Sequence, residues 1–368
     1  MINGIPRILI VRLSAIGDVV RVLPALHALR DRYPGAQIDW VVEGKSEAML
    51  EGHPAIDRRW VFHRTPDRGQ AWRTFRALMG HIRDARYELV LDFHGIAKSG
   101  LLTWASRAPR RIGFARPRAQ ECSWLAYTER VRLPHQRLNR IEENWLLCAA
   151  ADAPHRTLDV AIEVPDAVED ALDPFFTERF GDAKRVVAVH VAVDRPEKQW
   201  PLAHFAALCD LLMADGRFDV LLTYGPGQRD MAERVAGQAR RRPLLAPETP
   251  DLKHYAALLQ RVDLYVGGDT GPMHIAAALG MPTVAIFGGT DPAKHAPLRQ
   301  PSRVVYAGAD PFPGRPAVTQ AENWLAAVEP ESVYDACVDV LYPHELTETG
   351  AGEPSRLPPS HQELPAGS

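Results

Sequence analysis

Strand-like and helix-like segments alternate along most of this chain, in two successive runs. The strand patterns are short apolar runs at Arg7–Val11, Gln37–Val42, Leu89–Phe93, Arg185–Val191, Asp219–Thr223, Leu264–Val266 and Thr283–Phe287. Helical patterns separate them, and this alternation is typical of parallel sheets covered by helices. Two such runs in tandem predict an α/β chain with two doubly wound, Rossmann-like domains that face each other across a cleft.

The length supports the same division. A chain of 368 residues, of which 46% are hydrophobic, is long enough for two domains with sizeable cores. We expect a first domain at 1–155 and a second at 180–330, joined by a polar, Pro-bearing stretch. A closing helix is expected at 331–344. The tail at 345–368 is rich in Pro, Gly, Ser and Glu, and is predicted to be disordered.

The first chemically informative segment is Ser14–Asp18, which follows the first strand and precedes a helix expected at Val19–Asp31. Ligands in open α/β sheets bind at the carboxyl ends of strands, and Gly17 would permit a tight turn there. Asp18 would then point into the cleft. The alternative is that Asp18 only caps the helix by accepting hydrogen bonds from its first N–H groups.

The second segment, Val266–His274, again reads as strand, glycine-rich loop and helix. The N–H groups of Thr270–Met273 at a helix start would form an anion site suited to a diphosphate, and Gly271 would let a phosphate approach. Pro272 fits a first helical position. A capped turn without a ligand is the alternative.

Three further segments follow strands. Residues 193–200 carry Lys198, a candidate for neutralising a diphosphate, although alone this would be a surface loop. Residues 224–230 carry Gln228 and Asp230, which could bind ribose hydroxyls. Residues 92–99 carry Lys98, suited to an anionic acceptor, and His94, which is expected to be a structural hydrogen-bonding residue.

The two halves differ in charge. Residues 1–150 hold 24 Lys and Arg against 15 Asp and Glu, whereas the rest of the chain holds 19 against 31. Arginines are densest between Arg107 and Arg140, a segment that includes Arg118 and Arg137. Each could simply be solvated, but as a set they predict that the first half meets an anionic partner.

The sequence does not support several other classes of protein. No apolar stretch is long enough to span a membrane, and the N-terminus does not resemble a secretory signal. The four cysteines form no CxxC pair and are expected to be reduced, so we predict no zinc site. The HExxH, DxD and GxSxG motifs are absent from the sequence, and so is the full P-loop pattern GxxxxGK[ST]. An acidic second half argues against nucleic-acid binding.

Together these segments resemble the ADP-heptose:lipopolysaccharide heptosyltransferases, glycosyltransferase family 9. The resemblance covers about Arg7 to Leu341 and is most specific at residues 7–30, 92–100 and 266–292, the last of which ends in GGTDP. It implies the two-lobed GT-B architecture, with the acceptor on the first lobe and the nucleotide sugar on the second. It also implies inversion at the anomeric carbon and no metal or other cofactor.

The resemblance assigns roles to individual residues. Asp18 would be the general base that takes the acceptor hydroxyl's proton, and Lys198 would contact the diphosphate. The donor would be bound by Gln228, Asp230, Asp269, Thr270, Gly271, Pro272, Met273 and His274. The acceptor would be bound by Ser14, Gly17, His94, Gly95, Lys98, Arg118 and Arg137. The chain departs from its relatives at Gln228, where an acidic ribose partner is expected, and at Arg21, where a His is common.

The sequence therefore predicts an inverting glycosyltransferase that moves heptose from ADP-heptose to a lipopolysaccharide inner-core acceptor. It would be cytoplasmic and peripheral on the inner membrane, where an anionic, lipid-linked glycan would be its acceptor. Two alternatives remain: a GT-B relative that uses another nucleotide sugar, including an epimerase, and a non-catalytic nucleotide- or sugar-binding module.

Overall fold

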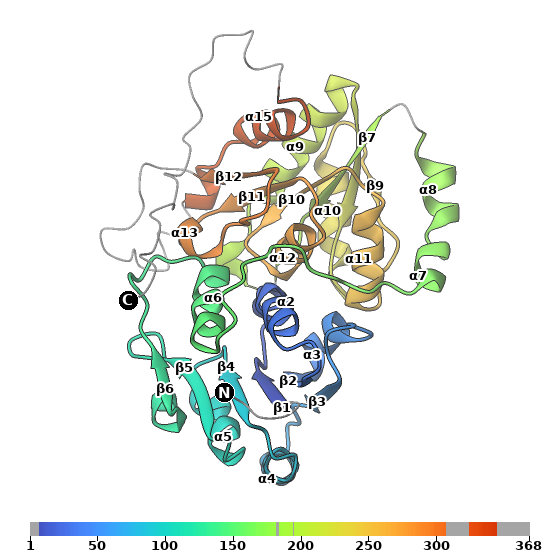
Figure 1. Cartoon of the computed structure of the whole chain (residues 1–368). Helices are drawn as coiled ribbons and strands as arrows, with labels where there is room; N and C mark the ends of the chain where they lie inside the picture. The colour runs from blue at the N-terminus through green and yellow to red at the C-terminus, as the bar shows by residue number, and fades with distance from the viewer. Residues whose placement is uncertain (1–6, 182–183, 194, 307–323, 344–368) are drawn as a thin grey trace.

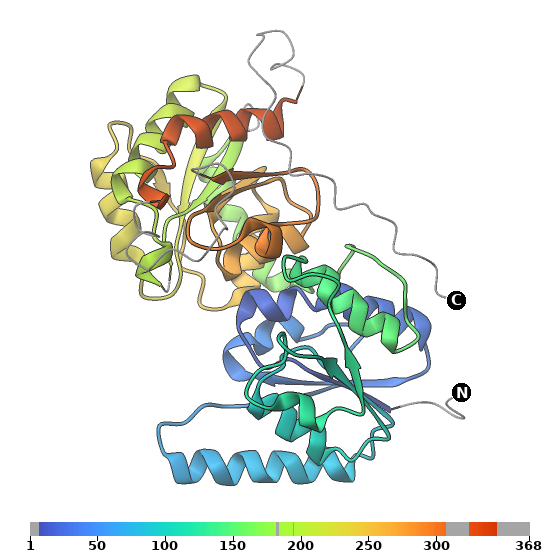
Figure 2. The same cartoon turned by 90° about the vertical axis from the view of Figure 1, so that its left-hand side faces the viewer.

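A computed structural model describes residues 7–181, 184–193, 195–306 and 324–343. Two lobes are stacked one on the other, each built on its own sheet (Figures 1 and 2). This confirms the predicted GT-B class of two Rossmann-like units. The predicted tail at 345–368 lies outside the described residues.

The first sheet is six-stranded and parallel, in the order β3-β2-β1-β4-β5-β6. Its strands are β1 (Arg7–Val11), β2 (Gln37–Glu43), β3 (Arg58–Phe62), β4 (Leu89–Asp92), β5 (Arg110–Phe114) and β6 (Glu129–Val131). Central strand β1 is apolar without alternation because helices cover both faces of the sheet. The order reverses between β1 and β4, so a crevice is expected beyond their carboxyl ends.

The second sheet is also six-stranded and parallel and repeats this topology, in the order β12-β11-β10-β7-β8-β9. Its strands are β7 (Arg185–His190), β8 (Phe218–Thr223), β9 (Leu244–Leu245), β10 (Leu264–Gly268), β11 (Thr283–Phe287) and β12 (Ser302–Tyr306). Here β7 and β10 flank the point of reversal, so each lobe contributes one pair of strand ends to a potential ligand crevice.

Helices connect the strands in both lobes. In the first lobe they are α1 (Ile16–Val20), α2 (Leu23–Arg32), α3 (Gly44–Glu47), η1 (Ala48–Leu50), α4 (Arg68–Asp84), α5 (Ala97–Ala105), η2 (Ser123–Ala126) and α6 (Arg140–Ala150). The later helices are α7 (Asp166–Asp170), α8 (Asp173–Arg179), η3 (Pro196–Lys198), α9 (Leu202–Asp215), α10 (Arg229–Gln238), α11 (Leu252–Gln260), α12 (Gly271–Ala278), α13 (Pro292–His295) and α15 (Pro330–Leu341).

Local sequence explains where several helices begin and end. Asp67 caps α4 by accepting hydrogen bonds from the N–H groups of Gly69 and Gln70. Asn139 caps α6 in the same way and forms a capping box with Glu142. Helix α9 ends at Gly216, whose φ of 84° suits a left-handed C-cap.

The helix expected at Val19–Asp31 is in fact two helices, α1 and α2. The chain breaks regular helix geometry after Val20 and restarts at Leu23, with Pro24 in the first turn of α2. Proline fits a first turn because its missing N–H needs no partner there. The early proline was therefore a signal for a helix start, which the sequence-based interpretation placed inside a longer helix.

Apolar packing continues across the boundary between the lobes. Val20 and Leu23 belong to the same buried cluster as Met273 and Ile275 of the second lobe. Helix α15 packs on α9 and thus on the second lobe. Three cysteines, Cys148, Cys209 and Cys337, are buried, and all four cysteines of the chain are free thiols.

Candidate active site

Asp18 lies at the carboxyl end of the first sheet, in the third position of α1. It is not the cap of this helix: the cap is Ala15, and no side chain caps α1. Instead, one carboxylate oxygen of Asp18 pairs with Arg12 and the other with Arg21. Burial alone would raise the pKa of this carboxyl, but Arg12 and then Arg21 outweigh it and hold the pKa well below its usual range. Asp18 is therefore ionised, and its side chain keeps 31% exposure.

The two arginines are anchored in different ways. Arg12 follows β1 directly, is buried, and donates to the carbonyl oxygen of Phe93 at 2.8 Å. Burial lowers the pKa of its guanidinium to about 10. Arg21 reaches the second lobe, where its Nη1 lies 2.9 Å from Nδ1 of His295. Asp18 is thus held by one residue fixed in the first lobe and one that bridges both lobes.

A second ion pair lies at the carboxyl ends of β7 and β10. Nζ of Lys198 donates to Oδ2 of Asp269 at 2.8 Å and to its carbonyl oxygen at 3.0 Å. Nε2 of His274 lies 3.5 Å from the other carboxylate oxygen. Burial would raise the pKa of Asp269, but His274 and Lys198 hold it well below its usual range. A diphosphate bound at this site would therefore either compete with Asp269 for the ammonium of Lys198 or share that ammonium with it.

The two lobes meet at the starts of α1 and α12. A Cβ at Gly17 would lie 2.4 Å from Cδ2 of His274, and one at Gly271 would lie 3.2 Å from Cγ2 of Ile16. Both glycines thus let the helices approach. Gly17 is buried and has a packing role, and its predicted contact with the acceptor stays a prediction.

The loop before α12 keeps the features of an anion site. Thr270 is the N-cap but makes no side-chain cap, and its hydroxyl lies 3.4 Å from the carbonyl oxygen of Gly268. Pro272 occupies the first turn, as expected. The side chain of Met273 is fully buried in the core, so the predicted contact with a donor concerns its backbone. Only its backbone N–H remains a candidate.

The loop predicted to hold the nucleoside is a tight turn after β8. Oε1 of Gln228 accepts a hydrogen bond from the N–H of Gly225 at 3.2 Å, so this carbonyl is already used within the turn. Gly227 has a φ of 74°, which favours glycine. Asp230 is exposed in the first turn of α10.

On the first lobe, Lys98 begins α5 beside β2 and β3. Its Nζ lies 3.0 Å from Oε1 of Glu43 and 3.8 Å from the centre of the Phe62 ring. Burial would raise the pKa of Glu43, but Lys98 and Arg64 outweigh it, so this pKa is lowered. The ammonium of Lys98 is thus partly exposed while it pairs with the buried carboxylate of Glu43.

His94 behaves as the structural residue that the sequence predicted. Its Nδ1 accepts from the N–H of Leu13 at 3.3 Å, and burial, helped by Arg12, lowers its pKa to about 3. The buried carboxylate of Asp92 accepts from the N–H groups of His94 and Gly95 at 2.9 and 3.0 Å. Ser14 is partly buried in the loop before α1.

Arg118 and Arg137 are engaged inside the molecule. Nε of Arg118 pairs at 2.7 Å with Glu143, whose side chain is only 1% exposed. Arg137 pairs at 3.2 Å with Asp291 of the second lobe. Arg118 thus pairs with a buried carboxylate and Arg137 bridges the lobes, and the expectation that both bind the acceptor stays a prediction.

Sequence-based reasoning missed Arg12, Glu143 and His295. Arg12 carried a signal, since a charged residue directly after an apolar strand lies at the carboxyl edge of the sheet. Glu143 lies far along the chain from Arg118, and His295 from Arg21, so the sequence did not link them, although Arg140 lies only three residues before Glu143.

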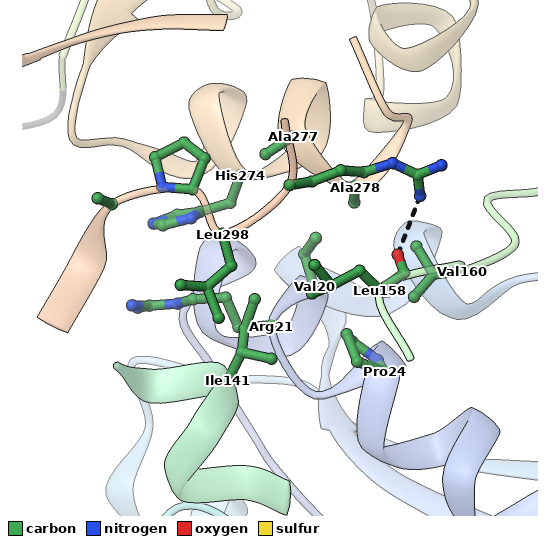
Figure 3. A pocket seen from close by; sticks show the side chains of 13 residues that line it. Val20, Arg21, Pro24, Ile141, Leu158, Val160, His274, Ala277, Ala278 and Leu298 are labelled. Atoms are coloured by element: carbon green, nitrogen blue, oxygen red, sulfur yellow. Dashed lines mark hydrogen bonds between the residues drawn. The ribbon is translucent and has the colours of Figure 1, made fainter. Parts of the chain in front are cut away.

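A pocket lies between the lobes beside this site (Figure 3). Arg21 and His274 approach it from opposite lobes, and the rest of its lining is mainly aliphatic. Since its lining holds no carboxylate or hydroxyl, we do not assign the sugar to it. Within the described residues no cluster of three or more His, Cys, Asp or Glu could hold a metal ion. None of the helices described is long and apolar enough to cross a membrane.

Comparison with known proteins gives a consistent result. A family model described as glycosyltransferase family 9 (heptosyltransferase) matches residues 75–324. Lipopolysaccharide heptosyltransferase 1 of Pseudomonas aeruginosa is 29% identical over 345 residues, which cover 89% of this chain and 91% of that protein.

Solved structures agree with this match. Heptosyltransferase WaaC of Escherichia coli with ADP-2-deoxy-2-fluoro heptose has a TM-score of 0.68 and 26% identity, covering 89% of this chain and 98% of its own. A family 9 glycosyltransferase from Veillonella parvula has a TM-score of 0.76 at 21% identity, covering 92% and 97%, and supports the fold alone.

Proposed function

The chain belongs to glycosyltransferase family 9, and from this we propose that it transfers heptose from ADP-heptose to the inner core of lipopolysaccharide. It is an enzyme, and the observation that supports this activity best is the family match over residues 75–324. The relatives named above are heptosyltransferases, and WaaC was solved with an ADP-heptose analogue. The match does not favour an epimerase or a non-catalytic binding module.

In the proposed reaction, Asp18 accepts the proton of an acceptor hydroxyl. The hydroxyl oxygen forms a bond to the anomeric carbon of heptose from the face opposite ADP. The bond between this carbon and the diphosphate breaks, with inversion, and ADP leaves. Because Asp18 has a lowered pKa, it is a weak base, and it takes the proton as the new bond forms rather than beforehand.

The leaving diphosphate gathers charge that the second lobe can stabilise. Lys198 and the N–H groups at the start of α12 supply this stabilisation, and the proposed step requires no metal or other cofactor. His274 links the two halves, since it affects the pKa of both Asp18 and Asp269. Gln228, Asp230 and Thr270 are proposed to hold the nucleoside and sugar, and Ser14, Gly95 and Lys98 the acceptor.

We further propose that the enzyme works at the cytoplasmic face of the inner membrane. The acceptor implied here is an anionic glycan on a lipid anchor, and the first half of the chain carries the excess of positive charge. A membrane-bound acceptor and a dissolved donor would then approach from different lobes.

The assignment of Asp18 is tested by Asp18→Asn. We expect turnover to fall by about 10²–10⁴-fold while ADP affinity, measured by calorimetry, stays unchanged. Asp335→Asn, an exposed carboxylate on α15, is the matched control and should leave both quantities unchanged. An Asp18→Asn enzyme with more than about half of the wild-type rate would remove Asp18 from this role.

A further inference from the structure

Helix α5 exposes large apolar side chains where a soluble protein would normally expose polar ones. Between Ser99 and Ser106 only positions 101 and 104 are exposed, and they hold Leu and Trp. Their exposed fractions are 43% for Leu101 and 58% for Trp104. Residues three apart share one face of a helix, so the two side chains form a single stripe.

The neighbours of α5 extend this stripe. Helix α4 packs on one side, where Phe75 joins Leu102 in one buried cluster, and carries Trp72, which is 54% exposed. On the other side a Cβ at Gly100 would lie 3.0 Å from Cα of Ser123 in η2, which carries Leu125 at 68% exposure. We call Trp72, Leu101, Trp104 and Leu125 the docking face. They are all of the large hydrophobic side chains found exposed among the described residues, and they lie on three adjoining elements.

Positive charge surrounds the docking face. Exposed arginines on and beside these elements are Arg68, Arg73, Arg76, Arg107 and Arg116, together with Arg64, which pairs with Glu43. The acidic groups on and beside these elements are fewer than the arginines: Asp67 caps α4, Glu121 accepts from the N–H of Ala97 at 3.0 Å, and Asp84 is exposed at the end of α4. The guanidinium of Arg116 also lies 4.8 Å from the ring centre of Trp124 in η2.

This combination fits one kind of partner. Tryptophan and leucine side chains favour the boundary between lipid headgroups and acyl chains, and arginines are attracted to anionic lipids. A contiguous apolar patch with a polar or charged rim marks an interaction surface, and here the rim has one sign of charge. The charge complementarity selects an anionic bilayer.

The docking face is joined to the active site by a short, rigid element. Helix α5 starts beside the site, where Lys98 pairs with Glu43, and runs to the docking face. Lys98 and Trp104 are six residues apart, which is about 9 Å along a helix axis. Helix α4 lies at the end of the first lobe remote from the second lobe in both Figures 1 and 2.

We propose that the docking face inserts into the headgroup region of an anionic phospholipid bilayer and presents the start of α5 to the headgroups. This deepens the proposed function and rests on it, because a lipid-anchored acceptor must reach the cleft from the membrane. The second lobe stays in solution, where it can exchange ADP-sugar and ADP.

Vesicle binding tests the proposal. The full-length protein is sedimented with vesicles of phosphatidylglycerol and phosphatidylethanolamine, and with zwitterionic vesicles for comparison. Wild type should bind the anionic vesicles, more weakly as salt rises. Binding should fall at least about tenfold for Trp104→Gln with Leu125→Gln, and for Arg73→Glu with Arg76→Glu. Arg234→Glu with Arg242→Glu, exposed on the second lobe, is the charge-matched control and should retain binding.

A single natural cysteine reports the contact directly. Cys122, next to Leu125 at the start of η2, is the exposed one of the four cysteines. A polarity-sensitive fluorophore on Cys122 should shift its emission to the blue with anionic vesicles. The shift should be absent in the Trp104→Gln, Leu125→Gln variant.

Two binding results would overturn the proposal: no vesicle binding by wild type, or binding by the docking-face variants that equals that of wild type. A third would be a wild-type dimer that these substitutions dissociate, because the face would then be a contact between two copies of the chain. ADP affinity and turnover on an acceptor stripped of acyl chains are measured in parallel. Both quantities should be unchanged in the variants. A wild-type protein that neither binds ADP nor turns over this acceptor would count against the proposed function instead.

Discussion

At the scale of single residues, the electrostatic environment of Asp18 decides what it can do. Two guanidinium groups hold it ionised, and one of them, Arg21, also contacts His295 of the other lobe. The proposed base is therefore coupled to the relative position of the lobes. Displacing Arg21 from Asp18 would raise the pKa of the carboxyl and make it a stronger base.

Replacing Arg21 by Gln tests this coupling through pH. Removing a positive charge that favours the carboxylate raises the pKa of Asp18, so the acid limb of kcat/KM should move up by about one to three pH units. Wild type should show no loss of kcat/KM between pH 8 and about pH 5, because the pKa of Asp18 lies below the ordinary value for a carboxylate. Arg132→Gln, an exposed arginine, serves as control, and identical limbs in all three proteins would contradict the coupling.

The sequence singled out Asp18, Lys198 and Asp269 because each follows a strand in a recognisable loop, and the structure places each of them in an ion pair at a strand end. It did not reveal that Arg12 and Arg21 share Asp18, or that Arg118 and Arg140 share Glu143. Such pairings depend on which strand ends become neighbours in three dimensions, and composition of a loop does not contain that information. Counting arginines in one segment therefore overestimated the charge available to an acceptor.

At the scale of elements, the contact between α1 and α12 depends on missing side chains. Gly17→Ala would strengthen the intrinsic helix propensity of α1, yet its methyl group would meet the buried ring of His274. We expect the clash to dominate, with a loss of about 1–3 kcal/mol in the free energy of unfolding. Turnover should fall by at least about tenfold as the catalytic groups shift.

Gly80→Ala provides the matched control in α4, where a new Cβ would meet nothing within 4 Å. It should raise the free energy of unfolding by about 0.5–1 kcal/mol and leave turnover unchanged. Urea unfolding and initial rates measure both variants. If Gly17→Ala stabilised the protein as Gly80→Ala should, the close approach of α1 and α12 would be unimportant.

Element types were predictable, while their exact bounds were less so. The helix expected around Thr74–Ala85 spans Arg68–Asp84, since the Asp67 cap starts it two turns earlier than the apolar pattern suggested. Apolar periodicity marks only the buried part of a helix. The exposed first turns of α4 are set by the cap and carry Trp72, which belongs to the docking face.

At the scale of the whole molecule, the alternation of strands and helices predicted two parallel sheets, but not the order of strands within them. It also gave no indication of how the lobes attach. Lys253 on α11 is one such attachment: it is buried, and its Nζ donates to the carbonyl oxygens of Glu51 in the first lobe, at 2.9 Å, and of Glu163 in the connecting segment.

Lys253→Met keeps the apolar stem and removes the ammonium, leaving these carbonyl oxygens without that donor. We expect a loss of about 1–3 kcal/mol in the free energy of unfolding and a larger radius of gyration by X-ray scattering as the lobes loosen. Lys184→Met removes an exposed lysine that pairs with Asp219, and should cost no more than about 1 kcal/mol. Equal effects of the two substitutions would rule out a special role for Lys253.

The repeated topology also bears on how such enzymes diversify. Each lobe is complete in its own sheet, and among the described residues the chain passes from the first lobe to the second between α6 and β7. One genetic crossover there would exchange an entire lobe between relatives and, under the proposed division of labour, would recombine acceptor and donor preferences. The hybrid would have to keep Gly17 and Gly271 opposite partners that fit them, because a bulkier surface at that seam would hold the two halves of the catalytic apparatus apart.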